Sequence, residues 1–304
     1  MSGSYEFLMI SAMYENGGNT TQRLFDGHPE LFSYPFESQP GTKYVADYLT
    51  SLYPVKYRWP VFPLHGTPEG DYATIIDEEC KVRIKTPASS KFRDWPIQLD
   101  DAERAAAFVR FMEGRPRTRG NLMEAFFRST AEVWRDSKRS GDEHVYVGYS
   151  PIIAVDAEKI IADYAAAHVL QVVRNPWSAY ADTKRRAVPL SIEHYMAGWC
   201  QNQLHALAAQ REHPDRVHIL RFEDIIADPL RALGGLLEQM GVAGSEALAA
   251  PSWNGVLLEE VYPWGTIRVP TPEANQRTAL ELSAEETDHI RSRTAPLLDA
   301  LGYA

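Results

Sequence analysis

A glycine-rich segment near the start of the chain has the residue types of an anion-binding loop. It runs through Gly17, Gly18, Asn19, Thr20 and Thr21. Glycines let backbone amides converge on an anion, and a helix N-terminus adds unpaired N–H groups and a favourable dipole. A threonine can cap such a helix and also offer its hydroxyl to a phosphate. A plain glycine turn with a threonine cap explains the same pattern, because short glycine motifs often occur by chance.

The segments around this loop predict a strand before it and a helix after it. Phe7–Ile10 is an apolar run with the length of a buried strand, and Gln22–Phe25 has helical character. The sequence DGHPEL, residues 26–31, predicts a turn that ends this helix. An order of strand, glycine loop and helix places the loop amides beyond the carboxyl end of a strand, where an anion can bind.

The rest of the chain alternates between apolar strands and amphipathic helices. This order predicts an α/β fold, a parallel β-sheet flanked by helices on both faces, with ligands beyond the carboxyl ends of the strands. No linker or repeat divides residues 1–304, so we expect a single domain. Expected strands are 81–85, 145–147, 169–173 and 217–220. Expected helices are 44–52, 101–112, 121–138, 156–164 capped by Asp156, one opening at Pro176, 192–211, 228–240 and 285–301.

Residues 53–96 differ in character, being rich in proline, tyrosine, tryptophan and glycine with weak periodicity. Long irregular segments in a compact domain often form lids over binding sites. The aromatic residues favour an ordered lid insertion, and its lysines and arginines make it locally basic. We therefore expect a bulky or anionic small molecule as the ligand that it covers.

Composition and charge exclude several classes of protein. A net charge of −10 argues against a general nucleic-acid binder, and no apolar run is long enough for a membrane span. The histidines show no metal-binding spacing, and two cysteines do not make a disulfide framework. With no secretory signal at residues 1–6, we expect a cytoplasmic protein without a metal site.

Three segments resemble the sulfotransferase family in the order in which that family has them. They are the N-terminal strand, loop and helix with DGHPEL, the stretch VGYSPIIAVDAEKIIADYAAAHVLQVVRNPWSAYAD, and the stretch VHILRFEDIIADPLRALGGLLEQMGV. The resemblance implies a P-loop-like sulfotransferase fold. It also implies transfer of a sulfuryl group from 3′-phosphoadenosine 5′-phosphosulfate (PAPS) to a hydroxyl or amine, without a metal ion.

The resemblance also implies roles for individual residues. The Gly17–Thr21 loop would hold the 5′-phosphate, and Arg174 matches the arginine that binds the 3′-phosphate. Arg268 lies where the family closes a late loop over the nucleotide. Glu37 falls near the glutamate that acts as base in tyrosine-directed and Golgi members. A salt bridge from Arg174 to Asp224 and a surface role for Glu37 are the alternatives.

Three positions depart from the family pattern. Glu15 stands where the family has a cation, Asp182 where it has a serine that contacts the phosphate, and Tyr149 where it often has a lysine. Carboxylates disfavour a highly anionic cofactor. Glu15 either points away from the site or is itself a catalytic carboxylate. The candidates for a replacement cation are Arg23, Lys184 and Arg185.

Two functions from different classes follow from these observations. The first is a PAPS-dependent sulfotransferase whose partner is a small-molecule acceptor, such as a secondary metabolite or a glycan. The alternative is a protein of the same fold that has lost PAPS chemistry and acts as a binding module or catalyses a different reaction. An ATP-dependent kinase is disfavoured because the GxxxxGK[ST] pattern is absent. Neither nucleic acid nor membrane is expected as a partner, and a homo-oligomer is left open.

Overall fold

A five-stranded parallel sheet forms the centre of the molecule, in the strand order β2-β3-β1-β4-β5. The computed structural model describes residues 5–303 except 87, 89–94, 96 and 259–270. The central strand β1 pairs with β3 on one side and β4 on the other, with Leu8 opposite both Val147 and His168. The strands of this sheet are β1 Glu6–Ser11, β2 Leu31–Ser33, β3 Val145–Tyr149, β4 Ala167–Val173 and β5 Val217–Arg221; β6 Ser252–Trp253 and β7 Val256–Leu257 form a small antiparallel pair.

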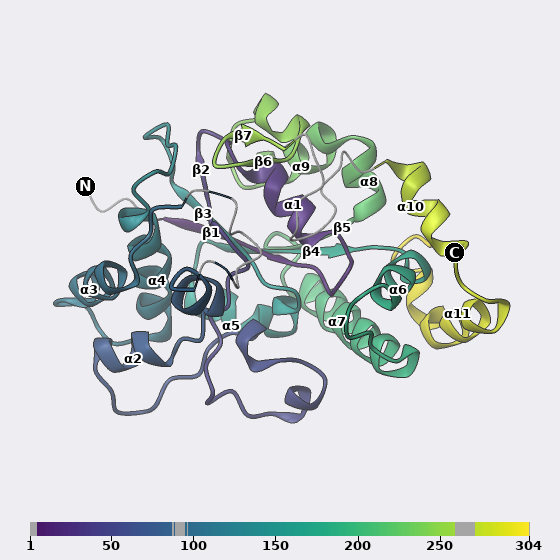
Figure 1. The fold of residues 1–304 in the computed structure, drawn as a ribbon, viewed down its shortest axis with the longest axis horizontal. Helices are drawn as coiled ribbons and strands as arrows, with labels where there is room; N and C mark the ends of the chain where they lie inside the picture. Colours follow the sequence, from purple (N-terminus) through teal and green to yellow (C-terminus); the bar gives the residue numbers. More distant parts are fainter. Residues whose placement is uncertain (1–4, 87, 89–94, 96, 259–270, 304) are drawn as a thin grey trace.

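Helices cover both faces of the sheet, as the alternating sequence predicts (Figure 1). The α-helices are α1 Gly18–Phe25, α2 Pro68–Thr74, α3 Asp101–Met112, α4 Arg119–Val133, α5 Ala157–Asp163, α6 Pro176–Lys184, α7 Ile192–Glu212, α8 Phe222–Ala227, α9 Pro229–Gln239, α10 Pro272–Ala279 and α11 Ala284–Leu298. Short 3₁₀ helices span Tyr48–Ser51, Val55–Tyr57, Ile153–Asp156 and Glu246–Ala249.

Alternation along β1 assigns its side chains to two separate cores. Phe7 and Met9 belong to the core that α3 and α4 cover, whereas Leu8 and Ile10 belong to the core beneath α1, α8 and α9. All four side chains are almost completely buried. Because β1 is buried on both faces, its sequence reads as a continuous apolar run. A third core lies among α6, α7 and α11, which Figure 1 shows beside the sheet.

Several predicted elements are confirmed, among them the strands at 145–147, 169–173 and 217–220 and the helix at 192–211. The expected strand at 81–85 is wrong, because Glu79–Arg83 forms a π-helix. There Arg83 pairs with Glu79 four residues earlier, and Lys81 donates to the carbonyls of Tyr72 and Ile75. An alternation of charged and apolar residues over five positions also fits a single helical turn, which local pairing stabilises here.

Three other boundaries differ from the expectation. The helix expected at 44–52 is only the 3₁₀ turn Tyr48–Ser51, and α4 ends at Val133 instead of Lys138. Asp156 does not cap its helix, because its buried carboxylate pairs with Arg58 Nε at 2.7 Å. A buried arginine is a stronger partner for a carboxylate than a backbone N–H.

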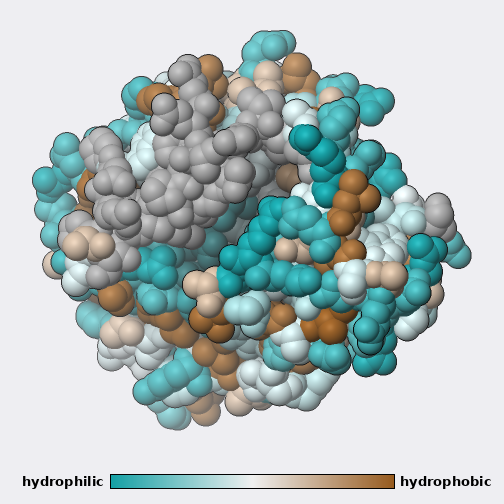
Figure 2. Space-filling model, turned by 45° about the vertical axis from the view of Figure 1, so that its right-hand side comes forward, coloured by the Kyte–Doolittle hydropathy of each residue, from teal (hydrophilic) through white to brown (hydrophobic). Residues whose placement is uncertain are grey.

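The aromatic residues of the segment 53–96 are largely part of the core. Tyr53, Trp59 and Tyr72 are all buried, so these side chains stabilise the fold directly. Closure of the segment over a site stays a prediction. No described helix is long and apolar enough to cross a bilayer. On the face drawn in Figure 2, the coloured apolar residues lie in separate patches among hydrophilic ones.

Candidate functional site

The carboxyl edge of the sheet brings together the glycine loop after β1 and Arg174 after β4. The Arg174 backbone N–H donates to Asn16 Oδ1 at 2.9 Å, and its guanidinium Nη1 donates to the Glu15 carbonyl at 2.8 Å. Asn16 is completely buried and also donates to the Tyr195 hydroxyl at 3.1 Å. The chain changes direction across the sheet at β1, and such switch points are where parallel sheets bind ligands.

The helix after the glycine loop begins earlier than the sequence suggested. Gly17 is its N-cap with a φ of 90°, so Gly18, Asn19 and Thr20 form the first turn of α1. The expected threonine cap is wrong, because the Thr21 hydroxyl donates back to the Gly17 carbonyl at 3.0 Å. Within the described residues, the backbone N–H groups of 18–20 donate to no protein acceptor. These three N–H groups are therefore available to an anion.

Both glycines of the loop are required by the aromatic rings that pack over it. A Cβ atom on Gly17 would lie 2.1 Å from the Phe222 ring, and one on Gly18 would lie 2.2 Å from the Tyr149 ring. The ring of Tyr149, at the position where the resemblance leads one to expect a lysine, thus occupies space beside the loop. Its hydroxyl is within 3.5 Å of the Ala12 carbonyl.

Arg174 is buried and held by an acidic partner. Its side chain is 8% exposed, and Nη1 lies 2.6 Å from the carboxylate of Asp182 in α6. Nε donates to Asn275 of α10. The alternative partner, Asp224, instead pairs with Arg221. Arg174 therefore sits beside the glycine loop with its charge balanced by Asp182.

Glu15 lies next to Arg174, but its carboxylate points toward Arg186. Arg186 Nη1 is 3.3 Å from Glu15 Oε1 and its guanidinium lies 5.0 Å from the centre of the Tyr14 ring. Burial raises the pKa of Glu15; Asp182 and Glu37 add to the rise, whereas Arg186 and Arg174 oppose it. Glu15 also has a positive φ of 62°, which is uncommon for a residue with a side chain.

The three cations suggested as replacements are all engaged by other groups of the protein. Arg23 is buried and donates to the Tyr34 carbonyl while its guanidinium lies 5.0 Å from the centre of the Trp253 ring. Lys184 pairs with Glu286 at 2.7 Å. Arg185 pairs with Asp182 and Glu281. The second arginine near the loop is Arg186, which the sequence reasoning missed although it directly follows Lys184 and Arg185.

Glu37 follows β2 and lies among tyrosines of the same edge. Its carboxylate lies near the Tyr57 hydroxyl, and burial together with Glu37 raises the pKa of Tyr57. Burial raises the pKa of Tyr14 to about 12, with Arg186 opposing and Glu37 adding to the rise. Burial and Glu37 also raise the pKa of Tyr149. These phenols are therefore protonated at neutral pH and can donate hydrogen bonds.

The remaining residues to place are Arg268, Asn16 and any group that could bind a metal ion. Arg268 lies outside the described residues. Asn16, which ties the loop to β4, was missed, although an asparagine directly before two glycines is a signal for a structured turn. No group of three metal-binding side chains occurs among the residues that the structure describes.

Comparison with known proteins identifies a family. A family model described as "Sulfotransferase family" matches residues 41–246, more than half of the chain. The matched stretch includes Arg174 and Asp182 but begins after the glycine loop and Glu37. No curated protein matches the chain in sequence.

Solved structures are similar to this chain at low sequence identity. The sulfotransferase domain from the curacin biosynthetic pathway is 16% identical with a TM-score of 0.51, covering 97% of this chain and 99% of that one. The sulfotransferase domain of the Synechococcus PCC 7002 olefin synthase is 16% identical with a TM-score of 0.48, covering 97% of both chains. A sulfotransferase from Alicyclobacillus acidocaldarius is 13% identical with a TM-score of 0.45, covering 99% and 97%. The likeness to the curacin domain shows the parallel α/β fold and nothing finer.

Proposed function

Because this chain belongs to the sulfotransferase family, we propose that it transfers a sulfuryl group from PAPS to a hydroxyl or amine of a small molecule. The observation that carries the proposal is the meeting of three features at one edge of the sheet. They are the free N–H groups at the start of α1, the buried Arg174, and the Glu37 carboxylate. Sulfuryl transfer requires a cradle for the anion, a cation that binds phosphate and a base for the acceptor's proton.

The donors at this edge fit a nucleotide that carries two phosphate groups. The N–H groups of residues 18–20 would hold the 5′-phosphate, and Arg174 would hold the 3′-phosphate. Arg186 adds a second cation near the loop. PAPS, when bound, supplies the sulfuryl group and a phosphate as its leaving group. Amides and arginines fixed in advance then stabilise the charge that develops on the leaving oxygen.

Glu37 is the group that we assign to the acceptor proton. Its carboxylate lies near the Tyr57 phenol, whose pKa it helps to raise, and so it belongs to the polar part of the site. A base must be within hydrogen-bond reach of the proton that it removes. The rings of Tyr14 and Tyr57 lie 6.1 Å apart in an edge-on arrangement. Aromatic walls of this kind suit a bulky acceptor, such as a secondary metabolite or a glycan, because rings stack on apolar faces.

The alternative function also has an observation in its favour. Asp182 pairs with Arg174 and Glu15 pairs with Arg186, so each arginine near the loop already has a carboxylate. A nucleotide must compete with these carboxylates for the same guanidinium groups. A protein of this fold that no longer uses PAPS and binds a less anionic ligand would be expected to pair its arginines with carboxylates in this way.

Calorimetric titration with 3′-phosphoadenosine 5′-phosphate, the desulfonated product, separates the two functions. Micromolar binding supports the enzyme, and 5′-AMP, which lacks the 3′-phosphate, should bind at least about tenfold more weakly. The double variant Glu15→Gln/Asp182→Ser removes both carboxylates and restores the family's serine. Binding by this variant but not by the natural chain would favour the alternative, with the carboxylates as the reason. If neither protein binds the nucleotide, the proposed PAPS-dependent function is contradicted.

A further inference from the structure

The guanidinium of Arg174 is held on two edges and one face by groups from different elements. Nη1 donates to the Glu15 carbonyl and to the Asp182 carboxylate. Nε donates to the side-chain oxygen of Asn275 in α10, and the guanidinium carbon lies 5.7 Å from the centre of the Phe222 ring. Nη2 donates to no acceptor among the described residues. A phosphate would therefore approach the guanidinium at Nη2, which carries two N–H donors.

Asn275 is itself held in one orientation. It is 4% exposed, its Nδ2 donates to Glu223 Oε1 at 3.0 Å, and its backbone carbonyl accepts from the Ser178 hydroxyl at 2.6 Å. A carboxylate can only accept, so the amide nitrogen must face Glu223 and the amide oxygen must face Arg174. α10 packs against α6 and α8, the helices that carry Ser178 and Glu223 (Figure 1). The amide is therefore a fixed acceptor for the arginine.

Glu223 anchors this arrangement from the first turn of α8. Its Oε1 also accepts from the backbone N–H of Asn175 at 3.0 Å and from Asn175 Nδ2 at 2.8 Å. Its Oε2 accepts from the Tyr303 hydroxyl at 2.7 Å. Donors on both oxygens fix the rotamer of the carboxylate. Because Asn175 directly follows Arg174, one carboxylate holds both the backbone beyond β4 and the amide that orients the arginine.

An amide is the side chain that suits this position. Its oxygen accepts a hydrogen bond from Nε but carries no charge, so it orients the guanidinium without neutralising it. Asp182 already provides one negative charge beside Arg174. A second carboxylate in place of Asn275 would oppose the approach of a phosphate.

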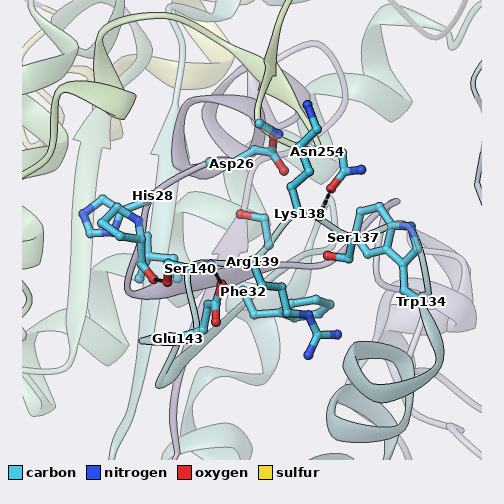
Figure 3. Close-up of a pocket in the computed structure, with 15 residues that line it drawn as sticks. Asp26, His28, Phe32, Trp134, Ser137, Lys138, Arg139, Ser140, Glu143 and Asn254 are labelled. Carbon is cyan, nitrogen blue, oxygen red and sulfur yellow. Dashed lines mark hydrogen bonds between the residues drawn. The ribbon is translucent and has the colours of Figure 1, made fainter.

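The DGHPEL turn, which the sequence resemblance associated with the phosphosulfate loop, belongs to another part of the molecule. It lies at the amino edge of the sheet, directly before β2, where it borders a small pocket (Figure 3). There Asp26 accepts from the Ser252 hydroxyl at 2.6 Å, and His28 Nε2 donates to the Ala243 carbonyl at 3.0 Å. The polar groups of this turn thus bind neighbouring loops, whereas α8 and α10 supply the groups around Arg174.

We propose that Asn275 positions Arg174 for the 3′-phosphate and so gives the site its preference for a nucleotide phosphorylated at that position. This role rests on the proposed function, in which Arg174 binds the 3′-phosphate. With Nε bound to Asn275 and Nη1 bound to Asp182, the guanidinium is fixed against rotation and Nη2 keeps one direction. A donor fixed in advance loses less conformational entropy when the ligand binds. Asn275 acts through Arg174 and is a positioning residue.

Calorimetric titration with 3′-phosphoadenosine 5′-phosphate and with 5′-AMP tests the inference. Asn275→Ala should raise the dissociation constant of the first nucleotide by about threefold to tenfold, the worth of one hydrogen bond, and leave that of 5′-AMP unchanged. Gln276→Ala, at an exposed neighbour in the same helix, should change neither. In an Arg174→Ala background, Asn275→Ala should have no further effect, because residues that act as one unit are not additive.

Asn275→Asp is a second variant, which keeps the shape of the side chain and serves if the alanine variant does not fold. It retains an acceptor for Nε but adds a carboxylate beside Arg174. The dissociation constant of 3′-phosphoadenosine 5′-phosphate should therefore rise by about tenfold or more. An unchanged constant in this variant would contradict the role of the neutral amide.

Nuclear magnetic resonance of the arginine side chains distinguishes failure of the inference from failure of the proposed function. The Nε–H signal of Arg174 is the one that Arg174→Ala removes from the nitrogen-15 spectrum. Without nucleotide, this signal should shift and exchange faster with water in Asn275→Ala, and it should stay unchanged in Gln276→Ala. An unchanged signal in Asn275→Ala would overturn the inference, and so would equal losses of affinity for both nucleotides.

The natural chain provides the remaining comparison. If it binds 3′-phosphoadenosine 5′-phosphate more tightly than 5′-AMP and Asn275→Ala reduces this preference, the positioning role is supported. If the natural chain shows no preference between the two nucleotides, the proposed function is contradicted and the role of Asn275 in phosphate binding is overturned with it. The signal of Arg174 would then still show whether the contact between the two side chains exists.

Discussion

At the scale of single residues, the candidate site depends on how four charges are paired. Arg174 pairs with Asp182 and Arg186 with Glu15, so these four side chains sum to zero charge beside the glycine loop; Arg185 also contacts Asp182. Arg174 is the buried member, and a buried cation left without partners is strongly destabilising. A phosphate group would therefore exchange one anionic partner for another at Arg174.

Arg174→Ala should weaken binding of 3′-phosphoadenosine 5′-phosphate by about tenfold to a hundredfold. A charge-assisted contact to phosphate is worth roughly 1.5–3 kcal/mol, and the variant loses it while Asp182 remains. Calorimetry measures the dissociation constant. Arg221→Ala is the matched control, since Arg221 also ends a strand at this edge but pairs with Asp224. An unchanged constant in a folded Arg174 variant would remove this residue from the site.

Glu37→Gln should lower turnover by a factor of about 10²–10⁴ and leave nucleotide affinity nearly intact. The amide cannot accept the acceptor's proton, whereas it preserves the size of the side chain. Turnover is followed as transfer of labelled sulfate from PAPS to a panel of phenols, alcohols and amines. Tyr57→Phe removes the phenol partner but keeps the carboxylate, and it should cost less. Full activity of Glu37→Gln would assign the base to another group.

At the scale of elements, the start of α1 is defined by packing as much as by its own sequence. The rings of Phe222 and Tyr149 lie against Gly17 and Gly18, and they come from α8 and β3. Substitution of either glycine must displace a buried ring from its core. The glycines thus serve the packing of the loop as well as the exposure of its amides.

Gly18→Ala should lower the free energy of unfolding by about 1–3 kcal/mol, the usual cost of overpacking a core. The control is Gly234→Ala in α9, where a Cβ would meet nothing within 4 Å. That change should stabilise the protein by about 0.5–1 kcal/mol, because alanine is the better helix residue. Urea denaturation measures both. Similar effects of the two substitutions would contradict the packing described at the loop.

At the scale of the whole molecule, stability should depend on pH through a histidine pair on the sheet. His168 Nδ1 and His218 Nε2 lie 3.1 Å apart on β4 and β5, so one ring nitrogen must accept the other's proton. Burial, His218 and Arg216 lower the pKa of His168 from 6.5 to about 4. In the unfolded chain the pKa of His168 is about 6.5. Above that pH the histidine is neutral in both the folded and the unfolded chain, so its full contribution to the free energy of unfolding is present.

Acidification from about pH 7 to pH 5 should therefore lower the free energy of unfolding by about 1–2 kcal/mol through this residue. The unfolded chain takes up a proton below pH 6.5, whereas folded His168 does not until the pH nears 4. Urea denaturation at each pH measures the slope. His168→Gln should flatten it, and His65→Gln, in an exposed loop, should not. An unchanged slope in His168→Gln would contradict this linkage.

The sequence by itself determined the elements whose signals are local. The apolar runs at 7–10, 169–173 and 217–220 are strands, and Pro176 opens α6 at its first position, because strand burial and proline geometry act within a few residues. The alternation of strands and helices also determined the parallel sheet. The placement of Arg174 beyond a strand end followed from that alternation.

The tertiary structure alone decided which of these residues meet. Glu15 pairs with Arg186, which is 171 residues away along the chain, and Asn16 accepts from Arg174 across 158 residues. A residue pattern fixes the face of a side chain, but its neighbour depends on strand order, which here sets β1 between β3 and β4. The DGHPEL turn, close to the glycine loop in sequence, lies at the opposite edge of the sheet because α1 separates the two. A helix carries the chain from the carboxyl end of one parallel strand back to the amino end of the next.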